Sequence, residues 1–171
     1  MRKTKDFVFF WNGPFSQWHK SQFIAGREER KFVCCEQWMM WKKAKLFGDD
    51  ATAYDIMKTE DPKEQKSLGR KVKNFQPEIW DQNKFDIVCE GNLLKFAQNK
   101  NLRKILMNTG DKILVEASPY DKIWGIGMRE DDEGVEDPKN WKGENLLGAA
   151  LTTLRDLFFK NYPEEGLPYL R

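Results

Sequence analysis

The sequence holds few of the residues on which metal and thiol chemistry depend. Its 171 residues include three cysteines and a single histidine, His19. Two of the cysteines are adjacent, and none has the C-x-x-C spacing of a zinc site. A disulfide framework, a histidine-based triad and a multi-histidine metal site are therefore excluded, and we expect no metal and no cofactor. We interpret Cys34 and Cys35 as small buried hydrophobic residues in a reducing compartment.

The sequence also has only a small net charge and no long apolar run. The 29 basic residues nearly balance the 27 acidic ones, which leaves a net charge of +2. This balance excludes a strongly basic nucleic-acid coat but leaves room for a local positive pocket. The first eleven residues lack the apolar segment and cleavage site of a signal peptide, and no run is long enough to span a bilayer. We expect a cytoplasmic protein with no membrane partner.

The residues that are present fit one well-filled domain. Hydrophobic residues make up 40% of the chain and aromatic residues 13%, without repeats or a linker, which suffices for one sizeable core. Strands are predicted at 7–11 and 112–118, and helices at 33–47, 49–58, 61–69, 77–99, 101–107 and 147–160. We therefore predict an α+β fold dominated by helices, in a single compact domain over residues 1–160. Residues 161–171, with two prolines and a glycine after Asn161, are predicted to form a loosely held tail.

One carboxylate lies where an apolar residue is expected. If residues 33–47 form a helix, Met40 falls about 40° from Glu36, and Lys43 returns to within roughly 20° of it, about 10 Å further along the axis. Burial disfavours a charged carboxylate, so Glu36 must be paired, hydrogen-bonded or chemically used. Two interpretations stay open. Glu36 caps the backbone or pairs with a buried arginine such as Arg70, or it is a general acid or base beside Lys43.

Several short blocks stand in a fixed order along the chain. They are FSQW at 15–18, EQWMM at 36–40, KA at 43–44, DP at 61–62, LGR at 68–70, W at 80, KF at 95–96, L at 106, TG at 109–110, LVE at 114–116, DKIWGIG at 121–127 and WKGENLLG at 141–148, followed by R at 155. Each block is weak alone, but the ordered set resembles the NADAR, or YbiA-like, family of N-glycosidases from about Phe9 to Phe158. The resemblance implies a YbiA-like fold and hydrolysis of the bond between ribose C1 and a nitrogen.

The resemblance implies two substrate classes. One is ADP-ribose attached to the amino group of guanine, in nucleic acid or in a nucleotide. The other comprises the phosphoribosylamino-pyrimidine intermediates of riboflavin synthesis. We favour the first, and keep as alternatives the second and a non-catalytic module that binds ADP-ribose. The expected partner is a ribosyl small molecule, or ADP-ribosylated DNA or RNA.

The resemblance also implies the catalytic residues. It places catalytic or pocket residues at Glu36, Trp80, Asp121 and Trp124, and the lysine of the first helix at Lys43. Glu36 is the expected acid or base, and Asp121 is expected to share the stabilisation of positive charge on the sugar. Lys43 has two options, since it can neutralise a phosphate or attack C1 of the opened sugar and form a Schiff base.

The other expected site residues would bind the substrate. Trp80 and Trp124 offer flat faces for a base, and core packing is the structural alternative. Gly125 and Gly127 would let the backbone approach the ribose, or else shape a tight turn. Asn145 precedes the last helix, whose free N–H groups would receive a phosphate, or it is a helix cap with no ligand.

Three further positions complete the predicted set. Arg70 is expected to bind a phosphate, or else to pair with Glu116. Ser16 and Gln17 match the loop motif of the family and are expected to hydrogen-bond the ligand.

Overall fold

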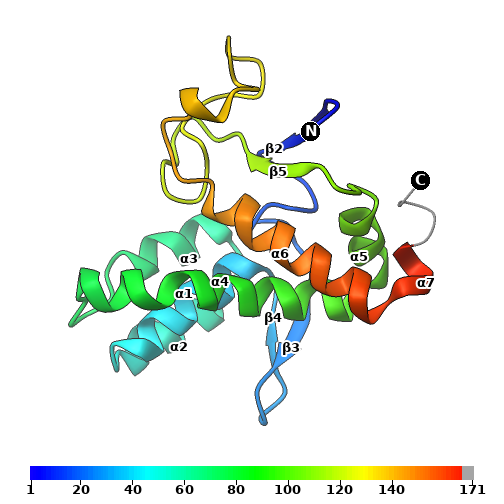
Figure 1. Ribbon diagram of the computed structural model, residues 1–171. Coiled ribbons are helices and arrows are strands. Elements are labelled where there is room, and N and C mark those ends of the chain that lie inside the picture. Colours follow the sequence, from blue (N-terminus) through cyan, green and yellow to red (C-terminus); the bar gives the residue numbers. More distant parts are fainter. Residues whose placement is uncertain (167–171) are drawn as a thin grey trace. The chain divides into compact units, whose positions relative to one another are not determined.

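The computed structural model describes residues 1–166, and helices dominate it (Figure 1). In chain order the elements are β1 (Arg2–Lys3), β2 (Phe7–Phe10), β3 (Phe23–Ala25), β4 (Arg30–Phe32), α1 (Cys35–Leu46), α2 (Asp50–Lys58), α3 (Pro62–Gly69), α4 (Pro77–Gln98), α5 (Lys100–Met107), β5 (Ile113–Glu116), a short 3-10 helix (Pro138–Asn140), α6 (Leu146–Asn161) and α7 (Pro163–Gly166). The predicted α+β class, dominated by helices with a few short strands, is confirmed. Contacts cluster into two units, which we call unit 1 (Met1–Ser16 and the chain from Lys100) and unit 2 (Gln17–Asn99).

Unit 1 is built on a three-stranded sheet of order β1-β2-β5. Strand β1 is antiparallel to β2, and β2 is parallel to β5 with Phe7 opposite Ile113 and Phe10 opposite Glu116. One face of the sheet buries Phe9 and Val115 in an apolar cluster whose members are Phe7, Phe9, Val115, Ala117, Ile126, Met128 and Val135. Because β2 and β5 run parallel, their carboxyl ends meet at one edge of the sheet.

Helix α6 packs against β5 in unit 1 (Figure 1). The approach is very close at Gly148, where an added Cβ would meet the carbonyl oxygen of Leu114 at 2.1 Å. Further along the helix the buried Arg155 donates to the hydroxyl of Thr109 (3.2 Å) and to the carbonyl of Lys112 (2.5 Å). Glycine at 148 and arginine at 155 therefore fix the helix to the strand and to the turn that precedes it.

Unit 2 is organised around α1, which contacts α2, α3 and α4. Its Trp38 lies against α4 so closely that a Cβ at Gly91 would come within 2.4 Å of the indole, whose N–H donates to the carbonyl of Ile87 at 2.9 Å. The amide of Gln37 donates to the carbonyl of Ile56 at the end of α2 (3.1 Å). Because neighbours cover several sides of α1, its first half is buried almost all round.

Two of the predicted helices begin with an aspartate that caps the first turn. Asp49 accepts a hydrogen bond from Thr52 N (3.1 Å), and Asp61 accepts one from Lys63 N (3.0 Å), with Pro62 in the first turn. The β3–β4 hairpin was not predicted. In the tail that was expected to be loosely held, residues 163–166 form α7. Glu165 of α7 is held there by two 3.0 Å hydrogen bonds from the guanidinium of Arg103. Residues 167–171 lie outside the described part.

Candidate functional site

Glu36 lies in the first turn of α1 with only 2% of its surface exposed. This burial confirms the expectation from helical periodicity. The backbone N–H of Glu36 donates to the carbonyl of Gln17 (3.0 Å), so one of the first N–H groups of the helix is satisfied by the preceding loop. Arg70, suggested as a buried partner of Glu36, is exposed. A buried carboxylate at the start of the central helix of unit 2 is therefore the starting point of the site.

A buried amide pair holds the loop that contacts Glu36. The Nδ2 group of Asn92 donates both to the carbonyl of Val88 (2.9 Å) and to Oε1 of Gln17 (2.7 Å). A carbonyl only accepts, so the bond to Val88 fixes which way the Asn92 amide points, and Asn92 in turn fixes Gln17. The Nε2 group of Gln17 is left buried with no hydrogen-bond partner among residues 1–166. The predicted ligand contact Gln17 therefore has a fixed amide orientation.

Lys95 adds a buried cation to the same part of unit 2. It is fully buried on α4, one turn after Asn92, and burial lowers the pKa of its ammonium group. Burial raises the pKa of the Cys34 thiol to about 11 and that of Cys35 to about 12. The charge of Glu36 raises both values further, whereas that of Lys95 lowers them. Both charges therefore act on the same two thiols, which stay protonated and unreactive at neutral pH.

Asn92 and Lys95 were missed as site residues by the sequence reasoning. Lys95 belongs to the KF block at 95–96 of the family pattern, which assigns it no role. The available signal was two polar residues spaced i and i+3 on a helix face whose other members, Val88 and Phe96, are buried and apolar.

Lys43, further along α1, lies beside Trp80 of α4. The Nζ of Lys43 donates to the carbonyl of Gly69 (2.9 Å) and lies 4.2 Å from the ring centroid of Phe75 and 5.5 Å from that of Trp80. Burial, and secondly the positive charge of Arg70, lower the pKa of Lys43. The structure therefore brings three predicted residues of unit 2 together around an amine that loses its proton more readily than an ordinary lysine.

The predicted residues of unit 1 lie in one turn after β5. Oδ1 of Asp121 accepts backbone hydrogen bonds from Ile123 (2.9 Å) and Trp124 (2.8 Å), so this carboxylate shapes the loop of residues 121–127. Gly127 has a φ of +64°, and a Cβ at Gly125 would lie 2.8 Å from the carbonyl oxygen of Glu116. Both glycines are therefore required by the turn itself. Trp124 is half-buried.

Asn145 does not cap the last helix with its side chain, which corrects that expectation. It adopts a left-handed φ of 54°, and its amide accepts from Glu116 N (2.9 Å) and donates to the carbonyl of Leu114 (2.9 Å). The N–H groups of Leu146 and Leu147 donate to carbonyls of the 121–127 loop, at 3.2 and 3.1 Å. A phosphate would compete with these bonds, so the geometry favours the alternative in which the start of α6 holds no ligand.

Ser16, the remaining predicted contact, is buried at the end of the first segment of unit 1. Its N–H donates to the carbonyl of Gly13 (3.0 Å). The predicted site residues are thus divided between the units. Gln17, Glu36, Lys43, Arg70 and Trp80 belong to unit 2, while Ser16, Asp121, Trp124, Gly125, Gly127 and Asn145 belong to unit 1.

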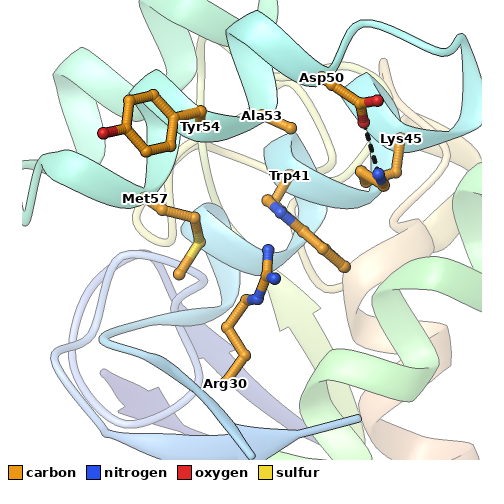
Figure 2. A pocket seen from close by; sticks show the side chains of 7 residues that line it. All are labelled: Arg30, Trp41, Lys45, Asp50, Ala53, Tyr54 and Met57. Atoms are coloured by element: carbon orange, nitrogen blue, oxygen red, sulfur yellow. Dashed lines mark hydrogen bonds and ion pairs between the residues drawn. The ribbon is translucent and has the colours of Figure 1, made fainter. Parts of the chain in front are cut away.

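The hollow in Figure 2 lies elsewhere in unit 2. It measures about 290 Å³ and is lined by Arg30, Trp41, Lys45, Asp50, Ala53, Tyr54 and Met57. The Arg30 guanidinium lies over the Trp41 ring, 5.0 Å from its centroid, and Lys45 pairs with Asp50. A neighbouring hollow of about 470 Å³ shares Arg30, Trp41 and Lys45. No predicted site residue lines either hollow.

Two further features bear on the class of site. Within residues 1–166, no group of three or more histidine, cysteine or acidic side chains is placed to hold a metal ion. In the same part of the chain, each helix is too short or too polar to traverse a bilayer.

Comparison with known proteins identifies the family. The model of the NADAR domain matches residues 9–158, which is well over half of the chain. The chain belongs to the NADAR family. This NADAR protein is 49% identical over 166 residues to N-glycosidase R617 of Acanthamoeba polyphaga mimivirus, an alignment that covers 90% of this chain and 97% of the relative.

Two other NADAR comparisons add to this. The chain is 31% identical over 123 residues to the riboflavin biosynthesis protein PYRR, chloroplastic, of Zea mays, which covers 67% of this chain but 18% of that protein. The NMR structure of the E. coli protein YbiA superposes with a TM-score of 0.75 at 21% identity, covering 95% of this chain and 90% of YbiA. At this identity the likeness shows the fold alone, and it confirms the predicted YbiA-like fold.

Proposed function

We propose that this NADAR protein is an N-glycosidase that releases ADP-ribose from ADP-ribosylated guanine. The enzyme class is confirmed by relatives named N-glycosidase, among them the 49% identical R617. The guanine-linked substrate goes beyond this enzyme class. It rests on the resemblance of the site residues to those of the family. One observation supports the proposed cleavage most directly. The Glu36 carboxylate, which is 2% exposed, and the Lys43 amine, whose pKa is lowered, lie on the same helix.

Glu36 is proposed as the acid and base of the reaction. Breaking the bond from C1 to nitrogen places positive charge on the sugar, which a carboxylate stabilises, and the base leaves more readily once its nitrogen is protonated. A carboxyl group shielded from water can hold the proton near neutral pH and deliver it to the departing nitrogen. After the base has left, the ionised Glu36 would take a proton from the attacking water.

Lys43 is proposed to act as an amine nucleophile. Its lowered pKa increases the fraction of free amine at neutral pH. In the ring-opened substrate C1 is still joined to the base nitrogen as an imine, and attack of Nζ on C1 gives an aminal. The base nitrogen takes up a proton and leaves as the free amine, so that C1 becomes an imine with Lys43. Addition of water to this imine returns the free lysine and the sugar. The alternative is that Lys43 stays protonated and neutralises a phosphate. Phe75 and Trp80 would then flank a cation.

The unit 1 residues are proposed to bind or assist. Asp121 would share in stabilising the positive sugar through its second carboxylate oxygen, since Oδ1 is used by the turn. The half-buried Trp124 of unit 1 and Trp80 of unit 2 each offer a flat face for stacking on a base. Arg70 is exposed and remains a proposed phosphate partner. Ser16 and the fixed side-chain amide of Gln17 are proposed to hydrogen-bond the ligand.

A decisive test measures ADP-ribose release from ADP-ribosylated guanosine by chromatography. We expect Glu36→Gln, which keeps the size of the side chain but cannot supply the proton, to lower kcat by about 100-fold or more. Glu90→Gln is the matched control, because Glu90 is an exposed carboxylate whose only ion pair in residues 1–166 is with Lys42. Thermal unfolding should show that both variants are folded. Full activity of folded Glu36→Gln would remove Glu36 from the mechanism.

The second candidate substrate is an early riboflavin intermediate. The likeness to the plant PYRR proteins favours it, at 31% and 32% identity over 67% of this chain. Assaying phosphoribosylamino-pyrimidines beside ADP-ribosylated guanosine decides the question, because the larger kcat/KM identifies the better substrate. Tight binding of ADP-ribose in calorimetry, without turnover of either substrate, would instead indicate a binding module.

A further inference from the structure

The side-chain amide of Asn92 uses both of its ends inside unit 2. Its Nδ2 group donates to the carbonyl of Val88 (2.9 Å) and to Oε1 of Gln17 (2.7 Å). Its Oδ1 atom accepts from the Cys35 thiol at 3.6 Å, and that thiol keeps its proton because burial raises its pKa to about 12. A carbonyl only accepts, and a protonated thiol supplies a hydrogen, so both contacts agree on which end of the amide is nitrogen. Asn92, which is 0% exposed, therefore has a single orientation.

Asn92 imposes an orientation on Gln17 in turn. Because Nδ2 of Asn92 can only donate, Gln17 must turn its oxygen toward Asn92 and its Nε2 group the other way. Gln17 is 6% exposed, and its Nε2 is buried without a hydrogen-bond partner among residues 1–166. A buried N–H group without an acceptor costs stability, and native proteins contain few of them. The two N–H groups of Nε2 therefore call for an acceptor that residues 1–166 do not supply.

This amide belongs to the part of unit 2 that contains the proposed acid and base. The backbone carbonyl of Gln17 accepts from the N–H of Glu36 at 3.0 Å, so the loop of Gln17 contacts the first turn of α1. Gln17, Glu36 and Asn92 all lie in unit 2, and no residue of unit 1 takes part in the arrangement. An oxygen of a ligand bound beside Glu36 is the acceptor that fits such a position.

We propose that Asn92 is a positioning residue, which holds Gln17 so that Nε2 donates to a ligand oxygen that can only accept. This rests on the proposed function, because it takes Gln17 to contact the ribosyl ligand. The ring oxygen of a ribose and the oxygens of a diphosphate only accept, whereas a hydroxyl group can also donate. With Asn92 in place, the site accepts an oxygen of this kind and rejects a ligand that presents a donor or an apolar group there.

Asn92→Asp reverses the polarity and nearly preserves the shape. A carboxylate has no N–H group, so the Gln17 amide should turn to donate to it and should present Oε1 to the ligand. Two acceptors would then face each other, and we expect the Kd of ADP-ribose in calorimetry to rise about tenfold or more. Asn161→Asp is the matched control, because Asn161 also donates to a carbonyl four residues earlier (2.8 Å) but is exposed at the end of α6. Thermal unfolding should show that both variants are folded.

Two further variants separate positioning from packing. Gln17→Glu makes the same reversal without a change on α4, so it should give the same rise in Kd even if Asn92→Asp does not fold. In a Gln17→Leu background, Asn92→Asp should weaken binding no further, because Asn92 acts through Gln17. A role of Asn92 in packing alone would add its own loss to that of Gln17→Leu.

A second probe, adenosine diphosphate, identifies the accepting oxygen. If Asn92→Asp weakens the binding of ADP-ribose but not that of adenosine diphosphate, the oxygen belongs to the terminal ribose. If it weakens the binding of both, the oxygen belongs to the diphosphate. An unchanged Kd of folded Asn92→Asp for both probes would overturn the positioning role.

Turnover distinguishes this role from the proposed cleavage. On ADP-ribosylated guanosine, Asn92→Asp should raise KM about tenfold and leave kcat within about threefold of the parent, because the contact is made alike in the bound substrate and in the transition state. Unchanged KM and Kd in Asn92→Asp, with an active parent, would remove the role of Asn92 and leave the cleavage standing. Weakened ADP-ribose binding in the variant, with no turnover of any riboside by the parent, would support the role of Asn92 and count against the cleavage.

Discussion

Lys43 is a cation held against two aromatic rings. Its Nζ lies 4.2 Å from the Phe75 centroid and 5.5 Å from the Trp80 centroid, an arrangement that stabilises the charged form, yet burial lowers the pKa. The nearby charge of Arg70 acts in the same direction as burial. On balance, a larger fraction of Lys43 is free amine than of an exposed lysine at the same pH. A nucleophilic lysine needs this property.

The prediction at Lys43 separates its two proposed roles. Lys43→Arg keeps the positive charge but removes the nucleophile, so we expect release of ADP-ribose to fall by at least about 100-fold. Borohydride added during turnover should reduce the imine and leave a covalent adduct on the parent protein, detected by mass spectrometry, and none on the variant. Near-full activity of Lys43→Arg with no trapped adduct would leave only the phosphate role.

Arg70→Gln provides a second measurement at the same amine. Removing the positive charge should raise the pKa of Lys43, so the acid limb of the kcat/KM profile should move to higher pH. If Arg70 binds phosphate, KM should rise as well.

Single residues were predictable from the sequence to the extent that helical periodicity governs them. Period 3.6 placed Glu36 among apolar residues, and it is buried. Helical periodicity does not reveal the role of Asn92. The partner of Asn92, Gln17, lies 75 residues away in the chain, and no local pattern connects the two residues. The exposure of Arg70, at the end of α3, was not predicted for a related reason. Packing decides which side of α3 faces α1, and no local pattern shows it.

At the level of elements, the start of α6 and the loop before it form one hydrogen-bonded structure. Leu146 and Leu147 donate to the loop, and Asn145 bridges to β5 through both atoms of its amide. The sequence marked this region as a helix start preceded by glycine and asparagine. It could not show that the asparagine side chain turns away from its helix toward a strand about 30 residues earlier, because the close pairing at Gly148 arises only on packing.

Asn145 is therefore predicted to stabilise the fold. Asn145→Ala removes the two hydrogen bonds that the buried amide makes with Glu116 N and the carbonyl of Leu114, so we expect the free energy of unfolding to fall by about 2–4 kcal/mol. Guanidinium denaturation of the ligand-free protein measures this free energy. Glu144→Ala is the control, because Glu144 is exposed. If Asn145 served the ligand alone, its variant would unfold like the parent and show only a raised KM.

Helices were easier to predict than strands in this chain. The caps at Asp49 and Asp61 are local signals, and each acts on a backbone group two or three residues away. The hairpin of β3 and β4 has only three residues in each strand, too few for an alternating pattern to be distinctive.

At the scale of the whole molecule, chain order and spatial order differ. Strand β2 pairs with β5 more than 100 residues later, so unit 1 is assembled from both ends of the chain while unit 2 is continuous. The sequence predicted both strands but not their parallel pairing, since that depends on contacts distant in the chain. The division of the predicted site residues between the units was beyond the sequence for the same reason.

The stability of the whole molecule should depend on pH through the buried thiols. The pKa of Cys35 is raised from 9.0 to about 12, first of all by burial. The folded chain therefore keeps a proton that the unfolded chain releases above pH 9, and the stabilisation, fully present below pH 9, is lost as the pH rises toward 12. Each such thiol lowers the free energy of unfolding by up to about 1.4 kcal/mol per pH unit in that window. Lys95 acts oppositely, because its pKa is lowered by burial and the unfolded chain holds its proton longer.

Cys35→Ala isolates the thiol from Lys95, since both proteins contain the lysine. We expect the variant to be less stable than the parent at pH 7, because it leaves a small cavity, and the difference to shrink by about 1 kcal/mol by pH 10. Guanidinium unfolding under reducing conditions, followed by tryptophan fluorescence from pH 7 to 10, measures both curves. Met39→Ala, at a buried position of the same helix that does not titrate, should lose stability by the same amount at every pH. Parallel curves for Cys35→Ala and the parent would mean that the thiol ionises alike in the folded and unfolded chain, so that the interior around α1 admits charge.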